Sequence, residues 1–131
     1  MIILQAEERG CDEWGCGNYG ASRGNRKHKG MDFKAESGQI LLSTVVGEVS
    51  KLGYPYSDDL DYRYVQVTDA AGYDIRFFYI DPSIRLGDKV MLLDPLGEVQ
   101  DLSNRYPEMT NHVHIEIKKG GRFYNPEAYF S

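Results

Sequence analysis

The chain has 131 residues, 41% of them hydrophobic and 27% charged, and its formal net charge is −5. This length is enough for one compact core, and no apolar run approaches the ~20 residues of a membrane-spanning helix. Acidic and basic residues are interspersed, whereas nucleic-acid phosphates are bound by clustered Lys and Arg. We therefore expect a single domain over residues 1–131, with a leading segment (1–20) and a core (21–131), that neither inserts into a membrane nor binds nucleic acid.

The first part of the chain contains a long segment, residues 10–30, that is predicted to be irregular. The opening "MIIL" of the chain is too short for the apolar core of a signal peptide and lacks a basic flank, so no signal peptide is predicted. Cys11 and Cys16 are separated by four residues, too many for the two-residue spacing of zinc knuckles or thioredoxin-type motifs. A small disulfide loop and two free thiols are both compatible with this spacing. Gly, Asn, Ser and Arg dominate residues 10–30, which favours a long loop over a helix.

Short runs rich in Val, Ile, Tyr and Phe follow, and turn residues separate them. These runs predict β-strands, and "DAAG" and "KKGG" predict hairpin turns at residues 69–72 and 118–121. The only short helical possibility is "PLGEVQDLSN" at residues 95–104, which Pro and Gly weaken. Long loops are expected at the beginning and near residues 54–61 and 94–110. The runs that predict strands cover residues 44–52, 62–69, 73–80, 88–93 and 112–119.

The three histidines of the chain fall into two short motifs. His28 precedes Asp32 by four residues, with Gly30 between them, and His112 and His114 share one face of a predicted strand. Imidazole nitrogens and a carboxylate oxygen are zinc ligands, and a set of two histidines and one carboxylate leaves a fourth position open, as in catalytic zinc sites. The residues alone leave open whether one or both histidines of the second motif bind metal. A metal-free structural β domain is the remaining alternative.

The motifs "HKGMD" (28–32) and "HVHIE" (112–116) resemble those of the LytM/lysostaphin-type zinc endopeptidases, which cut peptide bonds in bacterial cell-wall peptidoglycan. The resemblance covers roughly residues 20–130. It implies that His28, Asp32 and His114 are zinc ligands. It also implies that His112 is a catalytic histidine beside the metal.

A narrower similarity is to the chemotaxin-like proteins, a secreted vertebrate group with the same fold. It is carried by "CDEWGCGNYGASRGNRKHKGMD" (11–32), "NHVHIE" (111–116) and "PEAYF" (126–130). This resemblance implies that Cys11 and Cys16 are bonded. It also implies a zinc-binding signalling module without peptidase activity.

One position departs from the peptidase pattern. Active members of the family usually have a further histidine on a central strand, and matching "RFFYID" (76–81) to that strand puts Tyr79 in its place. A tyrosine hydroxyl, with a pKa near 10, can donate a hydrogen bond to an oxyanion but is a poor proton shuttle near neutrality. Glu116 lies two residues after His114 and could orient this histidine; an exposed strand carboxylate is equally compatible with the sequence.

Together these observations predict a mostly-β, single-domain, antiparallel LytM/lysostaphin-like fold with long loops flanking a zinc groove. The predicted function is Zn²⁺-dependent hydrolysis of peptidoglycan peptides, with His112 as general base and Tyr79 as oxyanion donor. Such a protein would be extracellular or cell-wall-facing, in a periplasm or a virion. It would be an exported hydrolase or a phage lysis or tail-associated protein in a larger assembly. The alternative is a zinc-containing binding module of the chemotaxin-like type, without turnover.

Overall fold

The computed structural model of the chain describes residues 9–12, 15–23 and 26–126. The opening "MIIL" and most of the closing "PEAYF" lie outside the described residues. All regular elements whose bounds the structure gives are β-strands. They are β1 (Cys11–Asp12), β2 (Gly15–Cys16), β3 (Ser22–Arg23), β4 (Arg26–Lys27), β5 (Met31–Lys34), β6 (Ile40–Leu42), β7 (Gly47–Gly53), β8 (Tyr64–Thr68), β9 (Asp74–Phe78), β10 (Ile80–Pro82), β11 (Lys89–Val90), β12 (Pro95–Val99), β13 (His112–Lys119) and β14 (Arg122–Tyr124).

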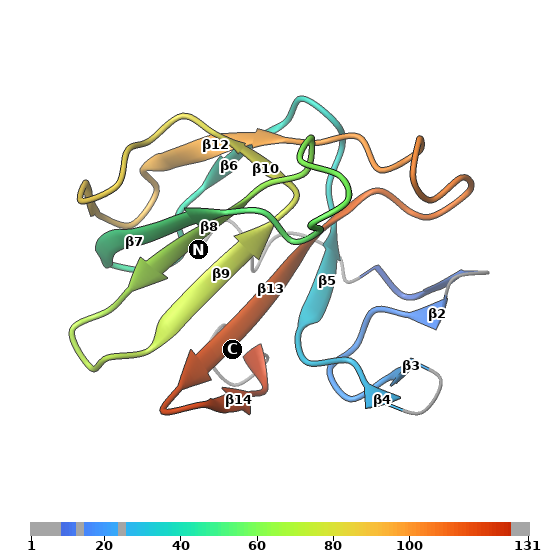
Figure 1. The fold of residues 1–131 in the computed structure, drawn as a ribbon, viewed down its shortest axis with the longest axis horizontal. Helices are drawn as coiled ribbons and strands as arrows, with labels where there is room; N and C mark the ends of the chain where they lie inside the picture. Colours follow the sequence, from blue (N-terminus) through green and yellow to red (C-terminus); the bar gives the residue numbers. More distant parts are fainter. Residues whose placement is uncertain (1–8, 13–14, 24–25, 127–131) are drawn as a thin grey trace.

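The largest sheet has seven strands in the order β11–β7–β8–β9–β13–β14, and β5 also pairs with β13. Every pairing in it is antiparallel, and β13 is the longest strand. One edge of β13 pairs with β9, and the other pairs first with β5 and then with β14 (Figure 1). The strand that carries two of the three histidines therefore lies inside the sheet, with both edges hydrogen-bonded.

A smaller sheet, β10–β12–β6, lies beside the upper end of the large sheet (Figure 1). Strand alternation explains how the two sheets share one core. Val65, Ile75 and Ile115 are fully buried on one face of the large sheet, and Leu96 of the small sheet belongs to the same apolar cluster. The residues between them in sequence, which include His114, lie on the opposite face of the large sheet. The site is therefore built on the face of the large sheet that does not pack against the core.

The prediction of a mostly-β, antiparallel fold is confirmed, and the strand predicted at residues 112–119 has the observed bounds. The helical possibility at residues 95–104 is wrong. Residues 95–99 form β12, which pairs with β10 on one edge and β6 on the other and buries Leu96. The loop expected at residues 94–110 is correspondingly shorter, because its first part is this strand. The run at 88–93 is a strand only over Lys89–Val90, since the chain turns through a positive φ at Leu93.

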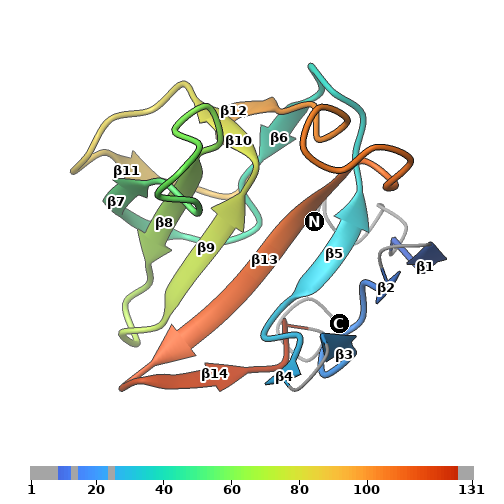
Figure 2. The same ribbon diagram turned by 45° about the vertical axis from the view of Figure 1, so that its right-hand side comes forward.

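Two loops rise at the same end of the large sheet, near the start of β13. Residues 54–63 join β7 to β8, and residues 100–111 join β12 to β13. Figure 2 shows the first loop in green, at the start of β8, and the second in orange, at the start of β13. Within the part of the chain that the structure describes, no helix is long and apolar enough to cross a membrane.

Candidate metal centre

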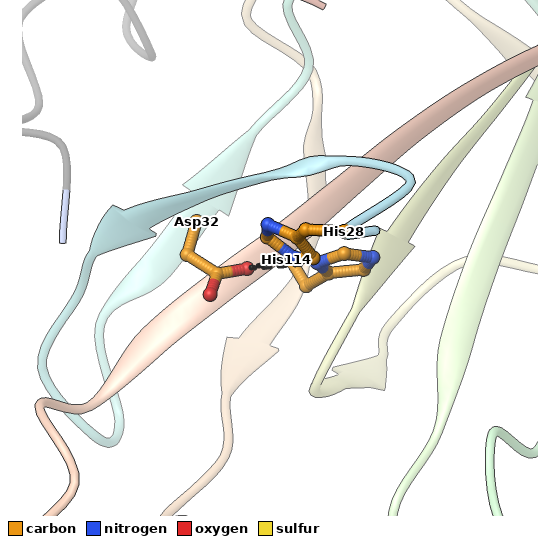
Figure 3. A group of neighbouring side chains, drawn as sticks. All are labelled: His28, Asp32 and His114. Carbon is orange, nitrogen blue, oxygen red and sulfur yellow. Dashed lines mark hydrogen bonds and ion pairs between the residues drawn. The ribbon is translucent and has the colours of Figure 1, made fainter. Parts of the chain in front are cut away.

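Two neighbouring strands and one loop bring three candidate metal ligands together (Figure 3). Asp32 lies on β5 directly opposite His114 on β13, because the two residues are register partners. His28 follows β4, and backbone hydrogen bonds from His28 to Ala21 and from Gly20 to His28 fix its position. A residue that is 86 positions away from His114 in the sequence thus contacts it in space.

The ligand atoms of this group converge at hydrogen-bonding distances. Nδ1 of His114 lies 2.9 Å from Nε2 of His28 and 2.7 Å from Oδ1 of Asp32. Nε2 of His28 lies 3.3 Å from the same carboxylate oxygen. Each residue offers one ligand atom, all within 4.8 Å of one another. Two imidazole nitrogens and one carboxylate oxygen fit Zn²⁺ and would supply three of the four ligands of a tetrahedral site.

The charges of the metal-free group also suit a cation. Burial alone would raise the pKa of Asp32, but hydrogen bonds from His114 and His28 outweigh it and hold this pKa well below its usual range. Burial alone would lower the pKa of His114, but its hydrogen bonds to Asp32 and Glu116 raise it to about 9. At neutral pH the metal-free site therefore holds an ionised carboxylate and a protonated imidazole. A bound metal ion would take the place of that proton.

The second ring nitrogen of each candidate ligand histidine also has a partner. Nδ1 of His28 lies 3.0 Å from the backbone oxygen of Asn18, and Nε2 of His114 lies 3.0 Å from Oε1 of Glu116. Such contacts fix the orientation of a metal-binding imidazole and leave one nitrogen free for the ion. Glu116, the residue expected to orient His114, thus contacts the second ring nitrogen of this histidine. Asn18 has no sequence signal, because it contributes only its carbonyl group.

His112 lies beside the cluster and is almost fully buried. Its Nδ1–H can donate to the backbone oxygen of Thr110 at 2.8 Å, which leaves Nε2, 3.5 Å from Oδ2 of Asp32, as the unprotonated nitrogen. Burial lowers the pKa of His112. A neutral imidazole with a free Nε2 lone pair has the protonation state that a general base needs at neutral pH.

Tyr79 is the single residue between β9 and β10 and has a φ of 72°. A positive φ is uncommon for a non-glycine residue and costs of order 1–3 kcal/mol. Two hydrogen bonds hold this backbone: Tyr79 N–H donates to Arg63 O at 2.8 Å, and Gln100 N–H donates to Tyr79 O at 2.9 Å. The ring meets that of His112 edge-on, with the centroids 5.5 Å apart. Burial raises the pKa of Tyr79, so its hydroxyl stays neutral.

Arg9, which no sequence pattern singles out, is buried, with 3% of its surface exposed. Its Nη1 donates to Oδ2 of Asp32 at 2.9 Å, and its Nη2 donates to Oδ1 of Asp12 at 2.6 Å. The other oxygen of Asp12 accepts from the backbone N–H of Thr110, whose carbonyl holds His112. A disulfide joins Cys11 to Cys16 and links β1, which carries Asp12, to β2. A short segment near the start of the chain thus contacts both the candidate metal ligand Asp32 and the support of His112.

The predicted site residues line one cleft of about 340 Å³. The two loops at the start of β13 supply further walls through Tyr56 and Tyr106. The lining residues are Arg9, His28, Asp32, Pro55, Tyr56, Phe78, Tyr79, Tyr106, Met109, His112, His114 and Glu116. The cleft therefore combines a metal-binding group, a neutral imidazole and tyrosine hydroxyls in one space.

Comparison with known proteins agrees with this arrangement. Leukocyte cell-derived chemotaxin-2 from Mus musculus is 31% identical over 115 residues, which cover 84% of this chain and 72% of the mouse protein. Myeloid protein 1 from Gallus gallus is 32% identical over 114 residues, which cover 84% of this chain but 34% of the chicken protein.

Solved structures show the same fold. Lysostaphin, an antimicrobial peptidase from Staphylococcus simulans, superposes with a TM-score of 0.75 at 15% identity. The match covers 99% of this chain, which spans about half (52%) of the lysostaphin chain. The catalytic domain of the prophage-encoded M23 protein EnpA from Enterococcus faecalis, a point mutant, has a TM-score of 0.68 at 23% identity, covering 88% of this chain and 89% of that one.

The sequence model of one family covers both halves of the site. Residues 26–126 match Peptidase family M23, and these residues include His28, Asp32 and the whole of β13. The lysostaphin-like fold and the chemotaxin-like similarity expected from the sequence are both confirmed. The chain therefore belongs to peptidase family M23.

Proposed function

We propose that this protein is a zinc-dependent endopeptidase that hydrolyses peptide bonds in bacterial peptidoglycan. The observation that supports it most directly is the convergence of His28, Asp32 and His114 beside a neutral His112 in one cleft. Family M23 is zinc-dependent, and the donor set of this chain fits that ion. When bound, Zn²⁺ supplies a Lewis acid that makes a water molecule more acidic and polarises a carbonyl group.

The side chains around the metal group perform the proton transfers. Nε2 of His112 takes a proton from the attacking water as its oxygen adds to the scissile carbonyl carbon. The hydroxyl of Tyr79 donates a hydrogen bond to the carbonyl oxygen, on which negative charge develops. His112 then returns the proton to the leaving nitrogen as the carbon–nitrogen bond breaks, which yields an amine and a carboxylic acid that loses its own proton to water. Glu116 keeps the ring of His114 oriented through its Nε2.

The proposal includes a place of action. Peptidoglycan lies outside the cytoplasm, so the enzyme would work in a periplasm, outside the cell, or on a virion that faces the wall. An exported hydrolase and a phage lysis or tail-associated protein, as part of a larger assembly, are the two settings in which this activity is useful.

A second candidate function is a zinc-containing binding module that holds peptides without cleaving them. Two observations favour it. Tyr79 occupies the position matched to a second catalytic histidine, and its neutral hydroxyl cannot shuttle a proton near pH 7. Leukocyte cell-derived chemotaxin-2 is among the relatives of this chain, at 31% identity in Mus musculus and 32% in Bos taurus.

One experiment separates the two candidates. Zinc-loaded protein is incubated with purified peptidoglycans of several cross-bridge types, and newly exposed amino termini are quantified. We expect release by the wild type and a loss of about 10²–10⁴-fold in His112→Gln, because a general base is removed. Stoichiometric zinc without release from any wall type would leave the binding module as the function. Zinc analysis of His114→Ala tests the ligand set, since an unchanged zinc content would exclude His114 from it.

A further inference from the structure

Three tyrosine hydroxyls form a chain that ends in the cleft. The hydroxyl oxygen of Tyr56 lies 2.8 Å from that of Tyr79 and 2.7 Å from that of Tyr106. The three residues come from separate segments: the loop of residues 54–63, the junction between β9 and β10, and the loop of residues 100–111. Burial raises the pKa of Tyr56 and of Tyr79, so these hydroxyls keep their protons at neutral pH.

The direction of this chain decides what Tyr79 can do. Each hydroxyl has one proton, so it can donate one hydrogen bond while its oxygen accepts another. If Tyr79 donates to Tyr56, its proton is occupied within the protein. If Tyr56 instead donates to Tyr79, the proton of Tyr79 is free to point into the cleft. Oxygen positions alone allow both directions.

Arg105 places a fixed donor at the far end of this chain. Its Nε–H donates to the hydroxyl oxygen of Tyr106 at 3.3 Å, and a guanidinium has no lone pair with which to accept. The oxygen of Tyr106 therefore accepts there with one of its two lone pairs. Donation from Tyr106 to Tyr56 is the direction in which each of the three hydroxyls accepts one hydrogen bond and donates one along the chain. Arg105 is itself held in place, because its guanidinium stacks 3.7 Å from the ring centroid of Tyr56 and pairs with Asp58 at 3.5 Å and Asp59 at 3.6 Å.

We propose that Arg105, Tyr106 and Tyr56 are positioning residues, which orient the hydroxyl proton of Tyr79 toward the carbonyl oxygen of the bound peptide. Tyr106 donates to Tyr56, Tyr56 donates to Tyr79, and Tyr79 donates into the cleft. Successive hydrogen bonds polarise one another, so the chain also strengthens the last donor. This inference rests on the proposed function, in which Tyr79 stabilises the developing oxyanion.

The kinetic test removes one hydroxyl at a time. Tyr106→Phe deletes the donor to Tyr56, and we expect kcat to fall about threefold to tenfold with KM unchanged, the effect of about one neutral hydrogen bond. The same substitution made in a Tyr79→Phe background should cause no further loss, because the chain acts only through Tyr79. A full additional loss in that background would overturn the inference.

Tyr62→Phe is the matched control. Its ring packs edge-on against Tyr56 and Tyr79, with centroids 6.0 and 6.1 Å away, but its hydroxyl donates to the backbone oxygen of Asp101 and not to the chain. The substitution disturbs the same aromatic packing but removes no hydroxyl of the chain, so kcat should stay within about twofold of the wild-type value. An equal fall in Tyr62→Phe and Tyr106→Phe would show that packing alone is responsible, and would overturn the inference.

A second readout does not depend on peptidase activity. Neutron diffraction from crystals of deuterated protein, with and without zinc, locates the deuteron between Tyr56 and Tyr79. We expect it on Tyr56, whereas a deuteron on Tyr79 would overturn the inference. If the wild type cleaves no peptidoglycan, the proposed function fails, and the deuteron position still decides the direction of the chain.

Discussion

The ion pair between Arg9 and Asp32 gives a quantitative prediction about the metal-free protein. Replacing Arg9 with Met keeps an unbranched side chain of similar length but removes the guanidinium that donates to Oδ2 of Asp32 at 2.9 Å. Asp32 is 2% exposed, so solvent cannot substitute for the lost partner. The substitution therefore leaves a buried carboxylate with one neighbour fewer.

The size of the effect follows from what Asp32 retains. Removing one partner of a fully buried ion pair typically costs about 3–5 kcal/mol. Asp32 keeps His114 at 2.7 Å and His28 at 3.3 Å, and these contacts offset part of the loss. We therefore expect the free energy of unfolding to fall by about 2–3 kcal/mol, and Tm to fall by about 10 °C for a chain of this length.

Urea unfolding in the presence of a chelator measures this change. Arg122→Met is the matched control, because Arg122 is exposed and its guanidinium lies over the ring of Tyr124, 5.9 Å from the centroid. Its free energy of unfolding should change by no more than about 0.5 kcal/mol. Asp32→Asn completes a double-mutant cycle with Arg9→Met, for which we expect a coupling above about 1.5 kcal/mol. Additive effects, or a loss in Arg9→Met no larger than in the control, would refute the assignment of Arg9 as the partner of the buried carboxylate.

Three further predictions concern the same centre. The apparent zinc affinity should rise about tenfold per pH unit up to the pKa of His114, about 9, and then level off, because zinc must displace the proton of His114. Chelator competition measures this affinity, and a pH-independent affinity between pH 6 and 8 would contradict the prediction. Gly30→Ala should lower both stability and zinc content, because an added Cβ would collide with the carbonyl of Ile115 and lie 2.8 Å from Cε1 of His114. Gly38→Ala is the control. Its φ is positive, which is strained for Ala, but no atom lies within 4 Å of the added Cβ, so this variant should retain its zinc. Replacing Cys11 and Cys16 with Ser should reduce the free energy of unfolding by about 2 kcal/mol. It should also weaken zinc binding, because the disulfide holds the segment in which Arg9 and Asp12 contact each other. Urea unfolding and zinc titration measure the two effects, and an unchanged zinc affinity would show that the disulfide does not influence the metal site.

The sequence predicts the main strands of this fold because the alternation of apolar and polar residues is a local feature. Alternation of apolar and polar residues over 112–119 specifies a half-buried strand, and the structure has that strand with the same bounds. The segment at 95–104 was mispredicted because its partners are distant in sequence. Gly97 and Pro95 argue against a central strand on local grounds, yet pairing with β6 and β10 imposes one, with a bulge between Pro95 and Gly97.

The histidine motifs likewise indicated candidate ligands, since their spacing carries the chemistry. The spacing did not indicate Arg9 or Asn18, because a single arginine and a backbone carbonyl have no pattern to recognise. The tyrosine chain is hidden for a related reason: Tyr56, Tyr79 and Tyr106 are spread over 50 positions and meet only through loop packing. Such residues are found by structure alone.

The two oxygens of Asp32 have different partners, and this division bears on how the site works. Oδ2 accepts from Arg9, while Oδ1 faces the ligand nitrogens of His28 and His114. A metal at this group would therefore meet a carboxylate that offers one oxygen, because the other is held by a guanidinium that cannot give way without leaving a charge buried. Residues 9–12 lie before the segment that matches the family, residues 26–126. The division into a leading segment (1–20) and a core (21–131) thus separates residues that contact one another. Arg9 donates to Asp32, and Asp12 accepts from the backbone of Thr110, whose carbonyl group accepts from His112.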